Sequence, residues 1–140
     1  MANHITTTWK GNMKFESTNP SGRNLFIDAS PKDGGQGDGY RPKALMLSSL
    51  AGCSGLDVAS LIKKMKLKVD DFKIEIEANL TEEYPKYYDK VNVEFHFFGA
   101  NLNKEKLQRA VELSTEKYCG VMEMFRRFAD VKTSVHYHNT

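Results

Sequence analysis

Two cysteines are the residues of this sequence best suited to chemistry. Cys53 lies in the run Ala-Gly-Cys-Ser-Gly, and Cys119 is followed by a glycine. If the two Cα atoms lie about 4.4–6.8 Å apart, one thiol can be oxidised and the other can resolve the oxidised sulfur. The two cysteines do not form a Cys-x-x-Cys pair, so any pairing between them is long-range. The alternative is that Cys53 is simply a small buried hydrophobic residue, the usual state of a free cysteine.

Other kinds of site have less support in the sequence. His136 and His138 fall on one side of an alternating segment, and His96 lies in another such segment. All three oppose the apolar positions, where solvent-facing residues belong, and no third type of ligand is spaced with them, so we predict no metal site. No serine lies in a Gly-x-Ser-x-Gly motif, and the glycine-rich segment 30–40 matches neither a dinucleotide-binding motif nor a P-loop. No cofactor is expected.

The segment that carries Cys53, residues 41–66, predicts a long helix beginning at Pro42. Proline suits the first helical turn because its missing N–H needs no partner there. Apolar residues occupy nearly every side of the segment, which ends in lysines and is shorter and more broken by serine and glycine than a membrane span. We predict a buried helix of a soluble protein with no membrane partner. Two glycines near Cys53 either let another segment approach closely or break the helix, leaving N–H groups to stabilise a thiolate.

The rest of the chain predicts strands on both sides of this helix. Three short segments before it and two longer ones after it alternate apolar and polar residues, as strands with one exposed face do. Two helical segments and a final alternating segment follow. This order predicts an α+β fold and not a βαβ fold. The expected strands are 4–9, 12–18, 24–29, 72–80, 91–98 and 131–138, and the expected later helices begin after Asn103 and around Val121.

Two connecting segments have distinctive compositions. Residues 30–40 contain four glycines and two aspartates without apolar residues to bury, so we expect a mobile surface loop. The connector 81–90 carries Tyr84, Tyr87 and Tyr88, whose amphipathic rings suit a groove or a partner surface. We predict that this connector lies at an interface.

Length and charge limit the class of protein. With 140 residues, the chain is expected to form one domain, residues 1–140. The net charge of +2 is nearly balanced and the lysines are scattered among acidic residues, which argues against nucleic-acid binding. The first ten residues lack the pattern of a secretory signal, so a cytoplasmic location is expected. The long helix, apolar on all sides, predicts an obligate homodimer, because one protomer has few elements left to cover it.

Two motifs of the chain resemble those of the OsmC/Ohr superfamily, most closely its smaller OsmC-like branch. They are ALMLSSLAGCSGLDVASLIKKMK and RAVELSTEKYCGV, separated by an alternating strand and the turn TEEYPKYY. The resemblance implies an α+β protein with antiparallel sheets and central cysteine-bearing helices, whose two chains intertwine into a dimer. It also implies a thiol peroxidase that favours organic hydroperoxides, in which Cys53 is peroxidatic, Cys119 is resolving, and a dithiol later reduces the disulfide.

The sequence departs from the family pattern at the start of the first-cysteine helix. In the active branches a glutamate there orients an arginine onto the thiolate, but this chain has Ala44 at that position. The motif does not fix the arginine either; Arg41, at the junction of loop and helix, is the first candidate and Arg23 the second. Two functions stay open: a two-cysteine hydroperoxide reductase in oxidative-stress defence, and a non-enzymatic OsmC-like dimer that binds a small apolar or reactive ligand in the same interface pocket.

Overall fold

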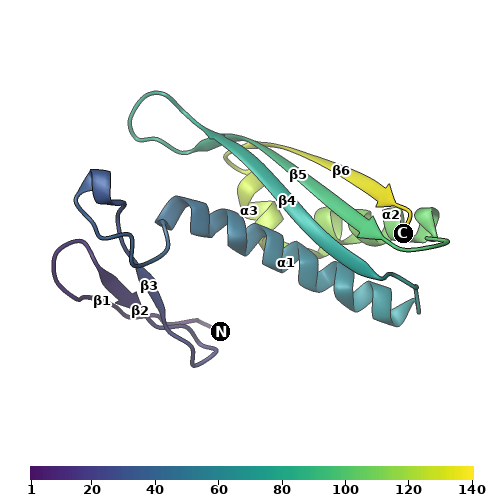
Figure 1. Ribbon diagram of the computed structural model, residues 1–140, viewed down its shortest axis with the longest axis horizontal. Coiled ribbons are helices and arrows are strands. Elements are labelled where there is room, and N and C mark those ends of the chain that lie inside the picture. The colour runs from purple at the N-terminus through teal and green to yellow at the C-terminus, as the bar shows by residue number, and fades with distance from the viewer. The chain divides into compact units, whose positions relative to one another are not determined.

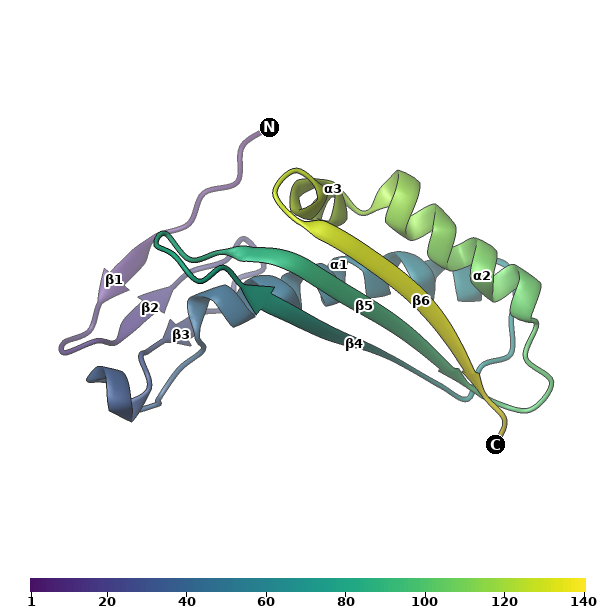
Figure 2. The ribbon, with the colours of Figure 1, turned by 90° about the horizontal axis from the view of Figure 1, so that it is seen from above.

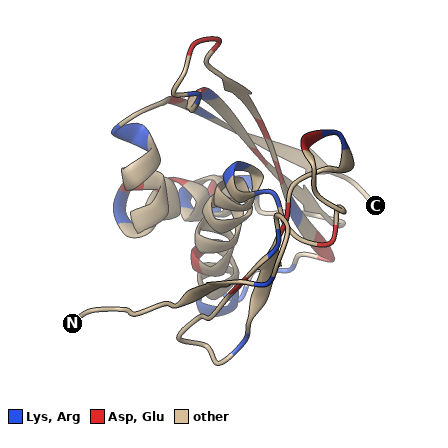
Figure 3. Ribbon diagram, turned by 90° about the vertical axis from the view of Figure 1, so that its left-hand side faces the viewer, with Lys and Arg blue, Asp and Glu red and all other residues tan.

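The computed structural model describes residues 1–140, which divide into two compact units, Met1–Met46 and Leu47–Thr140. Residues of both charge signs occur on helices and on strands (Figure 3). That the two units act as the one domain expected from the sequence stays a prediction.

The N-terminal unit is built on a small antiparallel sheet. Strands β1 (Thr7–Trp9), β2 (Phe15–Ser17) and β3 (Leu25–Ile27) are neighbours in chain order. They confirm the three strands predicted from the alternating pattern, although each is only three residues long. Such short strands bury little by themselves.

The loop that follows β3 is more organised than its composition predicts. It contains a short 3₁₀-helix (Pro31–Asp33), and the Asp28 carboxylate accepts hydrogen bonds from the backbone N–H groups of Ala29, Gln36 and Asp38. Asp28 is only 3% exposed. A single buried carboxylate thus satisfies three amides that would otherwise be bonded to water, and the expected mobility of this surface loop stays a prediction.

The cysteine-bearing helix α1 (Pro42–Lys64) begins at the predicted proline and ends in lysines. Its glycines do not break it. A Cβ atom on Gly55 would lie 3.3 Å from Ile74 Cδ1, so the glycine lets strand β4 pack closely against the helix. Of the two roles considered for the glycines, the structure supports close approach at Gly55.

Helix α1 is only partly buried in the single chain. Its buried residues are Leu50, Ser54 and Val58, and Leu56 is 75% exposed. By length and composition α1 is able to cross a membrane, a test that the core helix of a soluble protein also passes. The C-terminal unit packs against only one stripe of the helix, and burial of the remainder in a homodimer stays a prediction.

The C-terminal unit contains a three-stranded sheet with one parallel pair. Strands β4 (Asp71–Leu80) and β5 (Tyr88–Phe98) form the antiparallel pair predicted from their alternation. Strand β6 (Asp130–His138) runs parallel to β5. Helices α2 (Lys104–Leu113) and α3 (Gly120–Arg126) form the crossover between them (Figure 1).

This parallel pair corrects the expectation of purely antiparallel sheets without a βαβ unit. The two helices between β5 and β6 carry the chain back along the length of the sheet, so β6 starts beside the beginning of β5 (Figure 2). A crossover of this length is what a parallel connection requires. The overall α+β class is confirmed, with one crossover unit inside it.

The core lies between the inner face of this sheet and the three helices. Val91, Val93, Phe95 and Phe97 alternate along β5 and are all fully buried. The buried hydrophobic residues of the core are Leu50, Val58, Val91, Val93, Phe95, Phe97, Leu107, Ala110, Val111, Cys119, Met122 and Phe125. Every one of them belongs to the C-terminal unit.

Candidate active site

The structure brings the two predicted cysteines together. Cys53 lies in the middle of α1 and is half-buried, whereas Cys119 is the buried N-cap residue of α3. Both are free thiols, Cys53 packs against the core cluster that contains Cys119, and the Cys119 thiol is close enough to act on the pKa of Cys53. The two cysteines are 66 positions apart in the sequence. They come together because α3, which belongs to the crossover between β5 and β6, packs beside α1.

A π-helical turn positions Cys119. Residues Ser114–Tyr118 form this turn, and the Cys119 N–H donates to the Ser114 carbonyl at 2.7 Å. The Cys119 Sγ accepts hydrogen bonds from the Met122 N–H and the Ser54 hydroxyl, each at 3.3 Å. These contacts fix the sulfur at the start of α3; π-turns frequently mark functional sites.

A buried hydroxyl connects this turn to α1. Ser114 Oγ lies 3.1 Å from the Ser54 carbonyl oxygen and 3.1 Å from Asp57 Oδ2, and both serines are fully buried. The hydroxyl has one proton, so it donates to one of these two acceptors at a time. The helix and the turn that carry the two thiols are therefore held in register by Ser114.

Ser114→Ala is expected to lower the free energy of unfolding by about 1–3 kcal/mol, because a buried hydrogen bond between the turn and α1 is lost. Urea denaturation at one fixed protein concentration measures the change. Ser60→Ala removes an exposed hydroxyl from α1 and is expected to change stability by less than about 0.5 kcal/mol. Equal effects of the two variants would show that Ser114 does not hold the site together.

Burial raises the pKa of the Cys53 thiol above its ordinary value. The Val121 N–H acts in the opposite direction, but Cys119 and the Asp57 carboxylate raise the pKa further. No cation acts on this thiol. Within one chain, Cys53 is therefore mostly in the neutral thiol form at neutral pH.

The two candidate arginines belong to the N-terminal unit. Arg41 Nη1 donates to the Gly39 carbonyl at 2.8 Å and lies 3.4 Å from the Asp28 carbonyl oxygen. Arg23 lies in an exposed turn. The first turn of α1, which contains the exposed Ala44, has no acidic residue. A role of Arg41 or Arg23 at the thiol stays a prediction.

Sequence reasoning missed the polar groups around the thiols. Ser114 and Asp57 contact each other across 57 positions of sequence, which no local pattern indicates. One signal was available: Asp57 is the only charged residue between Lys43 and Lys63 in an otherwise apolar helix, and such a residue requires a partner.

Known proteins similar to this chain share its fold over nearly its whole length. The family model for OsmC-like proteins matches residues 35–134. Protein YhfA of Escherichia coli K12 is 29% identical over 126 residues, which cover 90% of this chain and 91% of YhfA.

Two solved structures illustrate the structural similarity. A hypothetical protein from Aquifex aeolicus is 27% identical with a TM-score of 0.83, and the match covers 100% of this chain and 97% of that one. An organic hydroperoxide resistance protein OsmC from Legionella pneumophila is 20% identical with a TM-score of 0.71, and the match covers 97% of each chain.

The fold is that of an α+β protein in which two free thiols lie together between the helices. The family match spans both cysteine motifs. The chain belongs to the OsmC-like protein family.

Proposed function

We propose that this protein is a thiol-dependent hydroperoxide reductase in oxidative-stress defence. The observation that carries the proposal is the packing of Cys53, on α1, against the core cluster that contains Cys119, at the start of α3. Relatives with this fold include organic hydroperoxide resistance proteins from Legionella pneumophila and Elizabethkingia anophelis. A thiol pair at the centre of a shared core is the arrangement that a peroxide-reducing cycle needs.

The proposed cycle uses Cys53 as the peroxidatic residue and Cys119 as the resolving residue. The Cys53 thiolate attacks one peroxide oxygen, the O–O bond breaks, and an alcohol leaves after taking a proton, so that Cys53 becomes a sulfenic acid. The Cys119 thiol then attacks the Cys53 sulfur, a disulfide forms, and water leaves. An external dithiol reduces the disulfide and is itself oxidised. The cytoplasm, where we expect this protein, is a reducing compartment that can supply such a dithiol.

Cys53 is the better candidate for the first step because it is the more accessible thiol. Cys119 is 4% exposed, whereas Cys53 is only half-buried. We therefore expect a peroxide to reach Cys53 before the more deeply buried Cys119. The apolar residues of α1 next to this thiol favour an organic hydroperoxide over hydrogen peroxide.

Consumption of cumene hydroperoxide with dithiothreitol as the reductant tests the proposal. The wild-type protein is expected to turn over many equivalents of this peroxide per chain and to act more slowly on hydrogen peroxide. Consumption no faster than the dithiothreitol blank would contradict the proposal.

A second candidate function rests on the raised pKa of Cys53. A neutral thiol beside an apolar surface suits a dimer that binds a small apolar or reactive ligand without turnover. Arg41 is the proposed cation that would lower this pKa in the enzyme. Because Ala44 provides no carboxylate to orient it, we expect a weak peroxidase.

We also propose that the protein is an obligate, intertwined homodimer. All buried core residues belong to Leu47–Thr140, so the first 46 residues contain a sheet without a hydrophobic core of its own. A three-stranded sheet needs an apolar surface to pack on. Exposed apolar residues that a second chain would cover include Trp9, Tyr40, Met46, Leu56, Tyr84, Tyr87 and Met124.

Leu56→Lys is expected to weaken dimerisation at least tenfold, because it puts a charge into the apolar side of α1 that the proposed partner covers. Sedimentation velocity at low micromolar concentration measures the change. Gln108→Lys adds the same charge to exposed α2 and is expected to leave the dimer intact. A wild-type protein that sediments as a folded monomer at this concentration would contradict the proposed dimer.

A further inference from the structure

Histidine and glutamate side chains gather on the outer face of the sheet, away from the thiols. Strands β5 and β6 are parallel, and their register places His96 directly opposite His136. Glu94 lies two residues before His96, so its side chain points to the same face. The sequence shows these residues only as separate alternating positions, and the parallel pairing brings them together.

The ligand atoms of these three residues lie close to one another. One nitrogen of His96, one nitrogen of His136 and one carboxylate oxygen of Glu94 are all within 4.8 Å of each other. His96 Nε2 lies 3.1 Å from Glu94 Oε1, and its ring stacks on that of His136 with centroids 4.7 Å apart. The His96 side chain is 12% exposed, so its position is well constrained.

We propose that Glu94, His96 and His136 form a binding site for a divalent transition-metal ion of the zinc type. Two imidazoles and one carboxylate are a ligand set typical of Zn²⁺ and related first-row ions, whereas Mg²⁺ and Ca²⁺ prefer sites made of oxygen atoms alone. Nothing in the proposed thiol chemistry uses these residues.

The distance between His96 and Glu94 already fits a shared ion. Ligand atoms bonded to one ion at about 2.0–2.2 Å lie roughly 3 Å apart, close to the separation of His96 Nε2 and Glu94 Oε1. His136 is hydrogen-bonded to Ser134 through Nε2 at 2.9 Å. A small rotation of this ring, or use of its other nitrogen, brings the third ligand to the ion.

His138 is positioned to orient the central ligand. Its Nε2 lies 2.9 Å from His96 Nδ1, and its ring is held by stacking on Phe98 and on His96. A neutral His96 has one proton, on either nitrogen. When that proton is on Nδ1 and is donated to His138, Nε2 is free to bind the ion, as in metal sites whose histidines are oriented by an outer acceptor.

Charge and space around the cluster also favour a cation. Glu75 Oε2 lies 3.8 Å from His96 Nε2, so a second carboxylate faces the proposed site. Lys73 pairs with Glu75 at 2.9 Å, and the remaining charge of Glu94 suits a dication.

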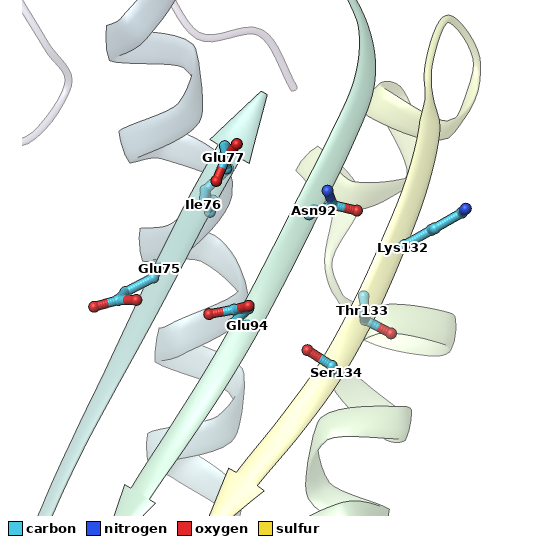
Figure 4. Close-up of a pocket in the computed structure, with 8 residues that line it drawn as sticks. All are labelled: Glu75, Ile76, Glu77, Asn92, Glu94, Lys132, Thr133 and Ser134. Atoms are coloured by element: carbon cyan, nitrogen blue, oxygen red, sulfur yellow. The ribbon is translucent and has the colours of Figure 1, made fainter. Parts of the chain in front are cut away.

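Glu94 also lines an open hollow of about 600 Å³, shown in Figure 4, which leaves a coordination position for water. The lining residues are Glu75, Ile76, Glu77, Asn92, Glu94, Lys132, Thr133 and Ser134.

The test is calorimetric titration of untagged, metal-free protein with Zn²⁺. One saturable equivalent per chain is expected. His96→Gln and His136→Gln are each expected to weaken Zn²⁺ binding at least tenfold, and His138→Gln, which acts through His96, about ten- to a hundredfold. His4→Gln changes the remaining histidine, which lies in the N-terminal unit, and is expected to bind as the wild type does.

The thiols are the competing source of metal binding, and the double variant Cys53→Ser/Cys119→Ser separates the two. If the proposed site is correct, this variant keeps the equivalent of Zn²⁺, and Co²⁺ added in its place gives only the weak visible bands of nitrogen and oxygen ligands. Loss of binding in the double variant, an intense sulfur-to-cobalt band, or wild-type affinity in His96→Gln would each overturn the proposal. So would the absence of saturable binding up to about 100 μM Zn²⁺. Far-ultraviolet circular dichroism confirms that each variant is folded.

Discussion

Cys53→Ser is expected to reduce the dithiol-dependent consumption of cumene hydroperoxide at least about a thousandfold, because a serine hydroxyl at neutral pH is a far weaker nucleophile than a thiolate. The residual consumption should equal that of the dithiol alone. The rate of peroxide loss at fixed dithiothreitol concentration, followed for both proteins at the same pH, measures the effect. Because Cys53 makes the first bond to oxygen in the proposed cycle, no other single thiol replacement should have so large an effect on that step.

Cys119→Ser is the matched control, since it makes the same replacement at the other thiol. This variant is expected to consume about one equivalent of peroxide per chain rapidly and then to slow, because its Cys53 sulfenic acid has no resolving partner. A Cys53→Ser protein that keeps more than about a tenth of the wild-type rate would show that another group attacks the peroxide.

The alkylation rate of Cys53 by iodoacetamide is expected to rise about tenfold per pH unit between pH 6 and 8 and to keep rising above that range. Burial, Cys119 and Asp57 raise the pKa of this thiol. Below its pKa the thiolate fraction falls tenfold with each unit of acidity, so a raised pKa extends the slope to higher pH. Peptide mass mapping after timed alkylation measures Cys53 separately from the buried Cys119. A plateau that begins below pH 7 would show that a cation lowers the pKa in the assembled protein.

Ala44 variants serve as the control for this pH profile and test whether an arginine reaches Cys53. Ala44→Glu adds a carboxylate that can hold Arg41 through a charge-assisted pair, and Ala44→Gln adds an amide of similar size. If Arg41 activates Cys53, the Glu variant should shift the alkylation profile to lower pH than the Gln variant does. A shift to higher pH in the Glu variant would favour the ligand-binding function, because the new negative charge would then act on the thiol alone.

Local patterns predicted the elements of this fold well. Pro42 marked the start of α1, and the period-two alternation located β4, β5 and β6. The direction of β6 was not predictable from its own residues, because alternation is the same in parallel and antiparallel strands. The partial burial of α1 in one chain agrees with the expectation that a single protomer has few elements left to cover this helix.

The two thiols of the candidate site could be predicted from the sequence, but the residues that surround them could not. The motifs around Cys53 and Cys119 identified the two thiols that the structure brings together. The contacts that hold them there, such as that between Ser114 and Asp57, depend on tertiary packing and have no local signature. The proposed metal ligands Glu94, His96 and His136 were not predicted as a group either. They come together through the parallel register of β5 and β6, which the sequence does not show.

Peptide mass mapping after treatment with one equivalent of cumene hydroperoxide tests the central proposal most directly. The two thiols interact in the folded chain, so oxidation of Cys53 should be followed at once by attack from Cys119. We expect the wild-type protein to yield an intramolecular Cys53–Cys119 disulfide, with the loss of both free thiols, and Cys119→Ser to yield a sulfenic acid at Cys53. Recovery of both cysteines as free thiols from the treated, folded wild-type protein would contradict the proposed peroxidase function.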